Sequence, residues 1–412
     1  MIERPRGTRD LKPEIMESRR WLESKLREKA ESYGYREVLT PTFEHTDLFL
    51  EKSGPSIVEE IYSFKDKGGR KIALRPEFTA SVMRMFSQCL REEPKPLKLY
   101  YFGSAFRYER PQSGRYREFW HFGTELIGAG SPKADAENIA LAFNSIKESG
   151  LEEMEMRISH LQILEDYLRS HDISREDREE IYHIIDKQEE NEELLNKFDL
   201  DEIFFELLDA PFESIPDLIG ETEAYKYLKE VLDYLSYYGI TGKDFEIDLR
   251  TVRGLDYYTG VVFEIDAEKL GAEKQICGGG DYNLGDLFGI DISSKGFAIG
   301  FDRLHLALEK EKELAGSKRK GCYIIPIGEE SQEYAYDVLF DLRAEKIKTD
   351  IDLKDRNIGK ALGFADKTEF KYSLLIGEDE VKNKKVALKD MDTGEQIQID
   401  KDKIVDEVKS DG

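Results

Sequence analysis

The sequence predicts an α+β protein in which an antiparallel-sheet domain is interrupted by an acidic helical segment and followed by a small α/β domain. Residues 97–127 are aromatic and alternating around a turn, which is typical of a long antiparallel hairpin. Residues 135–240 are rich in Glu, Asp, Leu and Tyr and indicate helices almost throughout. After residue 321, strand-like and helix-like segments alternate, which favours a largely parallel sheet.

Local signals predict the elements that precede the long hairpin. Residues 14–33 carry apolar residues at helical spacing, beginning near Pro13 and ending at Gly34. Residues 61–74 predict a short hairpin around a Lys-Gly-Gly turn. Residues 78–91 predict a helix.

Strand character returns after the acidic segment. Residues 245–249 and 259–265 are rich in strand formers, and residues 276–285 are rich in glycine. Residues 297–312 predict a helix entered from a strand, and the polar residues 313–321 predict a linker.

These elements predict how the chain divides into domains. The first domain takes residues 1–150 and 245–312, and residues 151–244 form an acidic helical insertion within it. The linker then leads to an α/β domain at residues 322–412.

Composition excludes several classes of protein. The 412 residues carry a net charge of -25, and residues 151–250 alone hold 29 acidic and 10 basic residues. Such acidity argues against a protein that coats nucleic acid non-specifically, although the rest of the chain can still present local basic surfaces. No apolar run approaches the roughly 18 residues of a membrane helix. Cys89, Cys277 and Cys322 form no CxxC pair, so we expect neither a disulfide framework nor a cysteine-rich zinc site, and a cytoplasmic protein.

Arginines and aromatic residues surround a Pro-Gly turn in residues 106–119. Side chains alternate along a strand, so Arg107 and Glu109 share one face of the outgoing strand. On the return strand one face is expected to carry Arg115, Arg117, Phe119, His121, Gly123 and Glu125. Guanidinium groups suit phosphate oxygens and an aromatic ring can stack on a base, but a solvated arginine-rich hairpin fits the same residues.

Other segments have two interpretations each. Glu77 and Thr79 stand where a helix begins, so they either cap that helix or bind an ammonium group. The glycines at 278–280 either let the backbone approach a ligand closely or form a bulge or tight turn. A cation such as Arg303 in the first turn of a helix is electrostatically disfavoured, and a bound anion would rationalise it. Neither a P-loop nor a Rossmann glycine fingerprint is present.

Together these segments resemble the histidyl-tRNA synthetases of class II. Residues 33–43 look like motif 1 of that class, residues 106–119 like motif 2 and residues 300–303 like motif 3. The run Arg253-Gly254-Leu255-Asp256-Tyr257-Tyr258 is similar to the histidine-specific signature, and the opening Pro5-Arg6-Gly7-Thr8-Arg9-Asp10 to the N-terminus of the family. The resemblance also implies that residues 322–412 bind the anticodon.

The resemblance implies a step of protein biosynthesis: activation of L-histidine with ATP to histidyl-adenylate and pyrophosphate, then transfer of histidine to the 3′ end of tRNA-His. Arg107 and Arg253 would act at the α-phosphate. The histidine substrate would contact Glu77, Phe78, Thr79, His121, Glu125, Tyr257, Tyr258 and Tyr282. ATP would contact Arg107, Arg115, Phe119 and Arg303. Arg110 and Gln112 would face the acceptor end of the tRNA. Mg²⁺ would accompany ATP without a metal site built from protein ligands, and motif 1 implies a homodimer.

The chain departs from the family pattern at three positions. His121 stands where members often have glutamine, Asp281 where the glycine loop commonly has arginine, and Phe78 where bacterial members commonly have glycine. The main alternative is the non-catalytic regulatory subunit of ATP phosphoribosyltransferase, which shares the core fold. That paralogue typically lacks the Arg253 signature and the anticodon-type domain.

Overall fold

The computed structural model describes residues 2–50, 60–110, 114–186, 197–198, 200–252, 258–311 and 319–410. Contacts divide the chain into two compact units, residues 1–313 and 314–412. In the described part, no helix is both long and apolar enough to cross a membrane.

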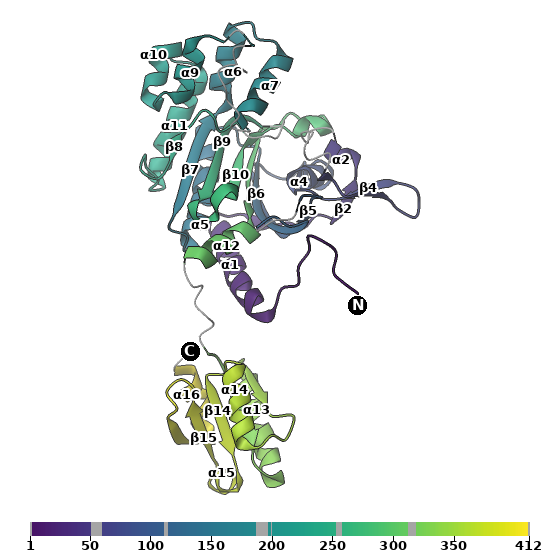
Figure 1. Cartoon of the computed structure of the whole chain (residues 1–412), viewed down its shortest axis with the longest axis vertical. Coiled ribbons are helices and arrows are strands. Elements are labelled where there is room, and N and C mark those ends of the chain that lie inside the picture. Colours follow the sequence, from purple (N-terminus) through teal and green to yellow (C-terminus); the bar gives the residue numbers. More distant parts are fainter. Residues whose placement is uncertain are drawn as a thin grey trace. The chain divides into compact units, whose positions relative to one another are not determined.

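An eight-stranded sheet forms the centre of the first unit (Figure 1), in the order β1-β5-β6-β11-β10-β9-β7-β8. The strands are β1 (Arg36–Glu37), β5 (Leu97–Phe106), β6 (Glu118–Ile127), β7 (Met154–His160), β8 (Glu246–Ile247), β9 (Tyr258–Ala267), β10 (Gln275–Tyr282) and β11 (Ser294–Gly300). All pairings inside the sheet are antiparallel, and only the two edge strands pair in parallel. The predicted antiparallel sheet therefore has parallel edges.

The long hairpin predicted over residues 97–127 is confirmed. Strands β5 and β6 pair continuously, from Leu97 opposite Ile127 to Phe106 opposite Glu118. The predicted hairpin at residues 61–74 is also confirmed, as β3 (Ser63–Lys65) paired with β4 (Lys71–Leu74). A third strand, β2 (Phe43–His45), completes this small sheet, and α2 (Asp47–Leu50) follows it.

Helices cover the large sheet. The predicted N-terminal helix is α1 (Pro13–Ser32), and it stops at Gly34, whose φ of 82° suits glycine. The predicted helix at residues 78–91 is α4 (Thr79–Met85), continued by a π-helical turn at Phe86–Leu90. Helix α5 (Pro132–Glu148) packs on β9, β10 and β11, and both α1 and α11 (Glu223–Tyr237) pack against α5.

The acidic segment is less helical than the sequence predicts. Helices α6 (Leu161–Ser170), α7 (Arg175–Asp186), α9 (Glu202–Asp209) and α10 (Ile215–Ile219) gather at one end of the large sheet (Figure 1). Residues Met154–His160, however, form strand β7 of that sheet, so the helical prediction is wrong there. Pairing along β9 explains the difference, because it buries Met156 and Ile158 at strand spacing.

One further prediction for the first unit needs correction, and one segment with two interpretations is resolved. The helix predicted at residues 297–312 begins at Phe301, as α12 (Phe301–Glu311), because residues up to Gly300 extend β11 between β6 and β10. The glycine-rich stretch forms strand β10, whose pairing with β9 shifts register between Gly280 and Tyr282, as at a β-bulge. A Cβ on Gly279 would lie 2.4 Å from the carbonyl oxygen of Gly296, so the close pairing of β10 with β11 requires glycine there.

The second unit is built on a five-stranded sheet in the order β13-β12-β14-β15-β16. The strands are β12 (Cys322–Pro326), β13 (Thr349–Ile351), β14 (Tyr372–Ile376), β15 (Lys385–Asp390) and β16 (Gln396–Asp400). β12 pairs in parallel with β13 and β14, whereas β15 pairs antiparallel with β14 and β16, so the sheet is mixed rather than largely parallel. The helices are α13 (Gln332–Ala344), α14 (Ile358–Lys367), α15 (Glu378–Asn383) and α16 (Ile404–Ser410).

Candidate active site

A cavity of about 230 Å³ lies against the middle strands of the large sheet. Its walls come from β5, β6, β9, β10 and β11, from the start of α4 and from the first turn of α12. Most of the predicted site residues line it: Glu77, Phe78, Thr79, Arg107, Arg115, Phe119, His121, Glu125, Tyr258, Tyr282 and Arg303. Arg110 is exposed and does not line the cavity, and Gln112, Arg253 and Tyr257 fall outside the described residues.

One end of the cavity carries two buried carboxylates. Glu77 accepts hydrogen bonds from the backbone N–H groups of Thr79 and Ala80, so it caps α4 while lining the cavity. Burial raises the pKa of Glu77 against these hydrogen bonds. Glu125 on β6 accepts a 2.6 Å hydrogen bond from the Tyr282 hydroxyl, and burial raises the pKa of Glu125 to about 8. A cationic ligand group would favour the ionised form of both carboxyl groups and so offset the free-energy cost of burying their charges.

Aromatic rings form the wall beside these carboxylates. Phe78 stacks on Tyr101 with ring centroids 4.4 Å apart and planes 7° apart. The Arg75 guanidinium lies 3.9 Å from the Phe78 ring centroid. This cation–π contact holds the Phe78 ring, at the start of α4, in its stack on Tyr101 of β5. Tyr101 pairs with Gly123 on β6, where a Cβ would lie 2.3 Å from the Tyr101 hydroxyl. Glycine at 123 therefore makes room for the Tyr101 side chain.

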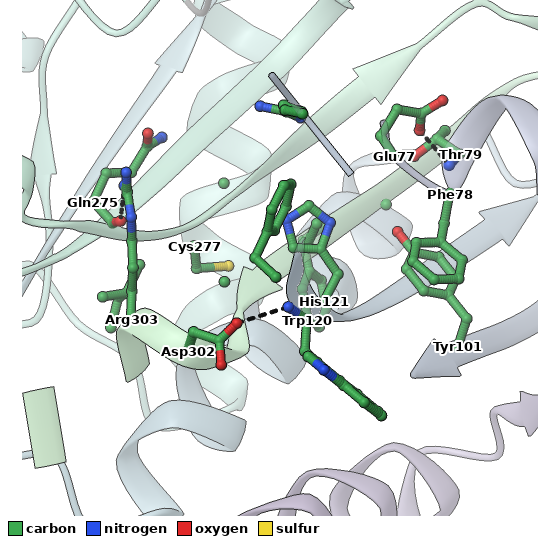
Figure 2. A pocket seen from close by; sticks show the side chains of 18 of the residues that line it. Glu77, Phe78, Thr79, Tyr101, Trp120, His121, Gln275, Cys277, Asp302 and Arg303 are labelled. Atoms are coloured by element: carbon green, nitrogen blue, oxygen red, sulfur yellow. Dashed lines mark hydrogen bonds between the residues drawn. The ribbon is translucent and has the colours of Figure 1, made fainter. Parts of the chain in front are cut away.

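Three arginines line the same cavity. Arg107 donates from Nε to the Pro76 carbonyl oxygen at 3.1 Å and lies 5.5 Å from the Phe119 ring. Arg115 forms an ion pair with Glu109 at 2.7 Å, and Arg303 donates to the carbonyl oxygen of Gln275 at 2.8 Å. Figure 2 shows Arg303 and Glu77 on opposite sides of the cavity. We call the side of Arg115 and Arg303 the cationic end of the cavity, and the side of the Glu77 and Glu125 carboxyl groups the anionic end.

His121 lies between the two ends (Figure 2). It is half-buried, and its ring meets Phe119 edge to face at 5.0 Å. Burial and the nearby charges of Arg107 and Arg303 lower the pKa of His121 to about 3, so the imidazole is neutral at pH 7. Its Nδ1 has no hydrogen-bond partner among the described residues, and so it can bond to a ligand.

Asp281 does not line the cavity, unlike its neighbour Tyr282. Its carboxylate lies 2.8 Å from the buried Lys295 ammonium, which also lies 2.6 Å from Asp135 on α5. Tyr227 on α11 donates a 2.7 Å hydrogen bond to Asp135. The departure from the family pattern at Asp281 therefore places a carboxylate in an ion-pair cluster behind the sheet.

The sequence predicted no ligand contact for several other cavity residues. They are Tyr101, Glu109, Gly114, Tyr116, Trp120, Gln275, Ile276, Cys277, Gly296, Phe297, Ala298, Gly300 and Asp302. Gly278, one of the glycines expected to approach a ligand or form a turn, also lines the cavity. Strand alternation was the available signal for Tyr101, which stands opposite Gly123 on the hairpin. The described residues contain no group of three His, Cys, Asp or Glu side chains that could hold a metal ion.

Comparisons with known proteins cover both units of the chain. The family model described as histidyl-tRNA synthetase matches residues 7–304, and the model described as anticodon binding domain matches residues 321–411. A curated histidine--tRNA ligase of Archaeoglobus fulgidus is 46% identical over 96% of this chain and 97% of its own.

Two solved structures are similar over most of the chain. The apo histidyl-tRNA synthetase of S. aureus is 33% identical with a TM-score of 0.74, covering 99% of this chain and 100% of its own. A Bacillus halodurans structure, described as an ATP phosphoribosyltransferase regulatory subunit/histidyl-tRNA synthetase, is 25% identical with a TM-score of 0.77, covering 92% and 98%.

Proposed function

The chain belongs to the histidyl-tRNA synthetase family, and on that premise we propose that it activates L-histidine with ATP and transfers the histidine to the 3′ end of tRNA-His. One observation supports this most strongly. A single cavity is lined by two buried carboxyl groups and three arginines, with Glu77 and Arg303 on opposite sides. An amino acid that carries an ammonium group fits the anionic end, and the phosphates of ATP fit the cationic end.

At the anionic end we assign the recognition of histidine. Glu77 and Glu125 face the ammonium and the imidazole, and Thr79 supplies a hydroxyl beside them. Tyr282 orients Glu125 through its hydrogen bond, and neutral His121 offers one donor and one acceptor. The Phe78 ring closes the wall of the same pocket. Tyr258 lines the cavity, and the role of Tyr257, outside the described residues, stays a prediction.

At the cationic end we assign ATP. Phe119 offers a ring for adenine, and Arg115 and Arg303 face the outer phosphates as preformed guanidinium groups. Mg²⁺ would enter with ATP as part of the substrate, and its ligands would be largely phosphate oxygens and water.

Arg107 can connect the two substrates, because its Nε bonds to the Pro76 carbonyl oxygen next to Glu77 while its guanidinium lies 5.5 Å from the Phe119 ring. We assign Arg107 to bind both the α-phosphate and the histidine carboxylate, which holds the two reacting groups next to each other. The histidine carboxylate attacks the α-phosphorus and pyrophosphate leaves. The tRNA ribose hydroxyl then attacks the acyl carbon of histidyl-adenylate, the acyl–phosphate bond breaks, and AMP leaves. No protein nucleophile is required, because positioning and charge stabilisation carry the reaction. The same role for Arg253 stays a prediction.

We also assign the contacts with tRNA, the domains and the oligomeric state. Arg110 is exposed near the cavity strands, so it can meet the acceptor end, and Gln112 stays a prediction. Residues 322–412 would bind the anticodon, as the matching domain model suggests. Residues 1–150 with 245–312 would form the catalytic domain and residues 151–244 its insertion. We also propose a cytoplasmic homodimer.

The regulatory subunit of ATP phosphoribosyltransferase is the alternative, and two observations speak against it. The curated relative that is 46% identical over nearly the whole chain is named a ligase, and the anticodon-binding model matches residues 321–411.

Charging of purified tRNA-His with labelled histidine, in the presence of ATP and Mg²⁺, tests the function. We expect charging by the wild-type protein and a loss of about 10²-fold or more in Arg107→Ala. A folded wild-type protein that binds histidine but charges no tRNA would favour the regulatory alternative.

A further inference from the structure

The N-terminal arm, defined as residues 5–10, lies against the cationic end of the cavity. The backbone N–H of Arg117 donates to the carbonyl oxygen of Gly7 at 2.9 Å. The Arg9 guanidinium stacks on the Tyr116 ring at 3.8 Å from its centroid, and it forms an ion pair with Asp302. The arm therefore contacts both the segment that enters β6 and the first turn of α12.

Asp302 joins four parts of the first unit. Its carboxylate binds Arg9 of the arm and Arg19 of α1, the latter at 2.5 Å. The other carboxylate oxygen accepts a 2.8 Å hydrogen bond from the backbone N–H of Trp120 on β6, which Figure 2 shows as a dashed line. The Asp302 side chain is only 3% exposed, so little solvent screening weakens these contacts.

The two outer arginines lie directly beside these contacts. Arg303 follows Asp302 in α12, and Arg115 precedes Tyr116. A Cβ on Gly114 would lie 3.5 Å from Leu306 and 3.8 Å from Cγ of Arg303, so the turn before Arg115 packs on α12. A side chain that holds Tyr116 and Asp302 together therefore sets the spacing between Arg115 and Arg303.

We propose that Arg9 is a positioning residue for the site of the outer ATP phosphates, an inference that rests on the ATP role proposed for Arg115 and Arg303. Arg9 does not line the cavity, so it acts through Tyr116 and Asp302. Arginine suits this position because its planar guanidinium can pair with a carboxylate and stack on a ring at once, whereas lysine can only pair. The N-terminal arm therefore supports the ATP site from outside the cavity.

Arg9 can be replaced without leaving a buried carboxylate unpaired, because Arg19 and Trp120 still bind Asp302. In Arg9→Met we expect the KM for ATP to rise about tenfold, the effect of losing one coupled polar contact. The KM for histidine and the thermal midpoint should stay at the wild-type values. Arg9→Lys should give an intermediate KM for ATP. The matched control is Arg4→Met, because Arg4 is exposed and pairs only loosely with Asp10, at 3.7 Å.

ATP–pyrophosphate exchange under saturating histidine, with Arg303→Ala measured alongside, separates the outcomes. A raised KM for ATP in Arg9→Met and Arg303→Ala, but not in Arg4→Met, supports the proposal. A raised value in Arg303→Ala alone overturns it and leaves the proposed function intact. An unchanged value in Arg303→Ala overturns the ATP assignment and the proposal together. A lower thermal midpoint in Arg9→Met, with both KM values raised, would also overturn it, since that pattern indicates a purely structural contact.

Discussion

Tyr282 donates a hydrogen bond from its hydroxyl to Oε2 of Glu125 at 2.6 Å, which joins β10 to β6 at the buried end of the cavity. Both side chains are almost completely buried. The bond orients a carboxylate that would otherwise face the substrate in several rotamers. The specificity pocket for histidine is therefore built by two strands that are distant in sequence.

Tyr282→Phe removes only this hydroxyl. We expect the KM for histidine to rise about tenfold to a hundredfold, because a buried hydrogen bond to a carboxylate contributes about 1.5–3 kcal/mol. The KM for ATP should stay unchanged in pyrophosphate exchange. Tyr323→Phe is the matched control, since it removes a buried tyrosine hydrogen bond, to Asp352, in the other unit. Equal effects on the KM values of both substrates would contradict the assignment.

Histidine binding should release protons. Burial raises the folded-state pKa of Glu125 to about 8, above its unfolded value, so Glu125 is protonated in the empty protein at pH 7. The contribution of this group to stability is complete below its unfolded pKa and is lost as the pH rises through about 8. A bound cation favours the carboxylate and drives the proton off. Calorimetry at pH 7 in buffers of different ionisation enthalpy should therefore report net release of about one proton. Glu125→Gln should abolish the release, and no release from the wild-type protein would count against this picture.

His121 should not contribute to the pH profile of activity between pH 6 and 8. Burial and the surrounding arginines lower the pKa of His121 to about 3, so it stays neutral throughout that range. His121→Gln retains a neutral side chain with one donor and one acceptor group, so the shape of the profile of kcat/KM should not change. An ionisation near pH 6.5 that disappears in the glutamine variant would show that His121 titrates.

Lys295→Met should destabilise the first unit by about 3–5 kcal/mol, because it leaves the buried carboxyl groups of Asp135 and Asp281 without their cation. Adding Asp281→Asn should restore part of the loss. Both tryptophans, Trp21 and Trp120, lie in this unit, so their fluorescence in denaturant follows its unfolding alone.

Lys269→Met provides the matched control for that measurement. Lys269 forms a surface ion pair with Glu153, so its loss should leave the unfolding midpoint unchanged. Equal shifts of the midpoint in both lysine variants would mean that the buried ion pairs of Lys295 stabilise the unit no more than a surface ion pair does.

The sequence predicted the elements whose signals are local. The hairpin at residues 97–127 was predictable because alternation and its turn lie in one stretch of chain. Strand β7 was missed because its seven residues lie in an acidic helical context, and only pairing with β9, more than a hundred residues later, makes them a strand. The glycines of β10 were ambiguous for the same reason, since the close approach of Gly296 is a tertiary contact.

The candidate site followed the same rule. Strand alternation placed Phe119, His121 and Glu125 together, and the cavity contains all three. It could not place Asp302, whose partners Arg9 and Arg19 lie almost three hundred residues away. Nor could it show that Asp281 leaves the cavity for Lys295, because the partner stands on the neighbouring strand.

Amino-acid-dependent ATP–pyrophosphate exchange, with each standard amino acid in turn and Mg²⁺ present, tests whether this cavity activates histidine. We expect exchange with histidine alone, because only histidine presents both an ammonium and an imidazole to Glu77, Glu125 and Tyr282. Exchange with a different amino acid would contradict the assignment of this pocket. Histidine binding without any exchange would contradict the claim that the arginine end positions ATP for attack.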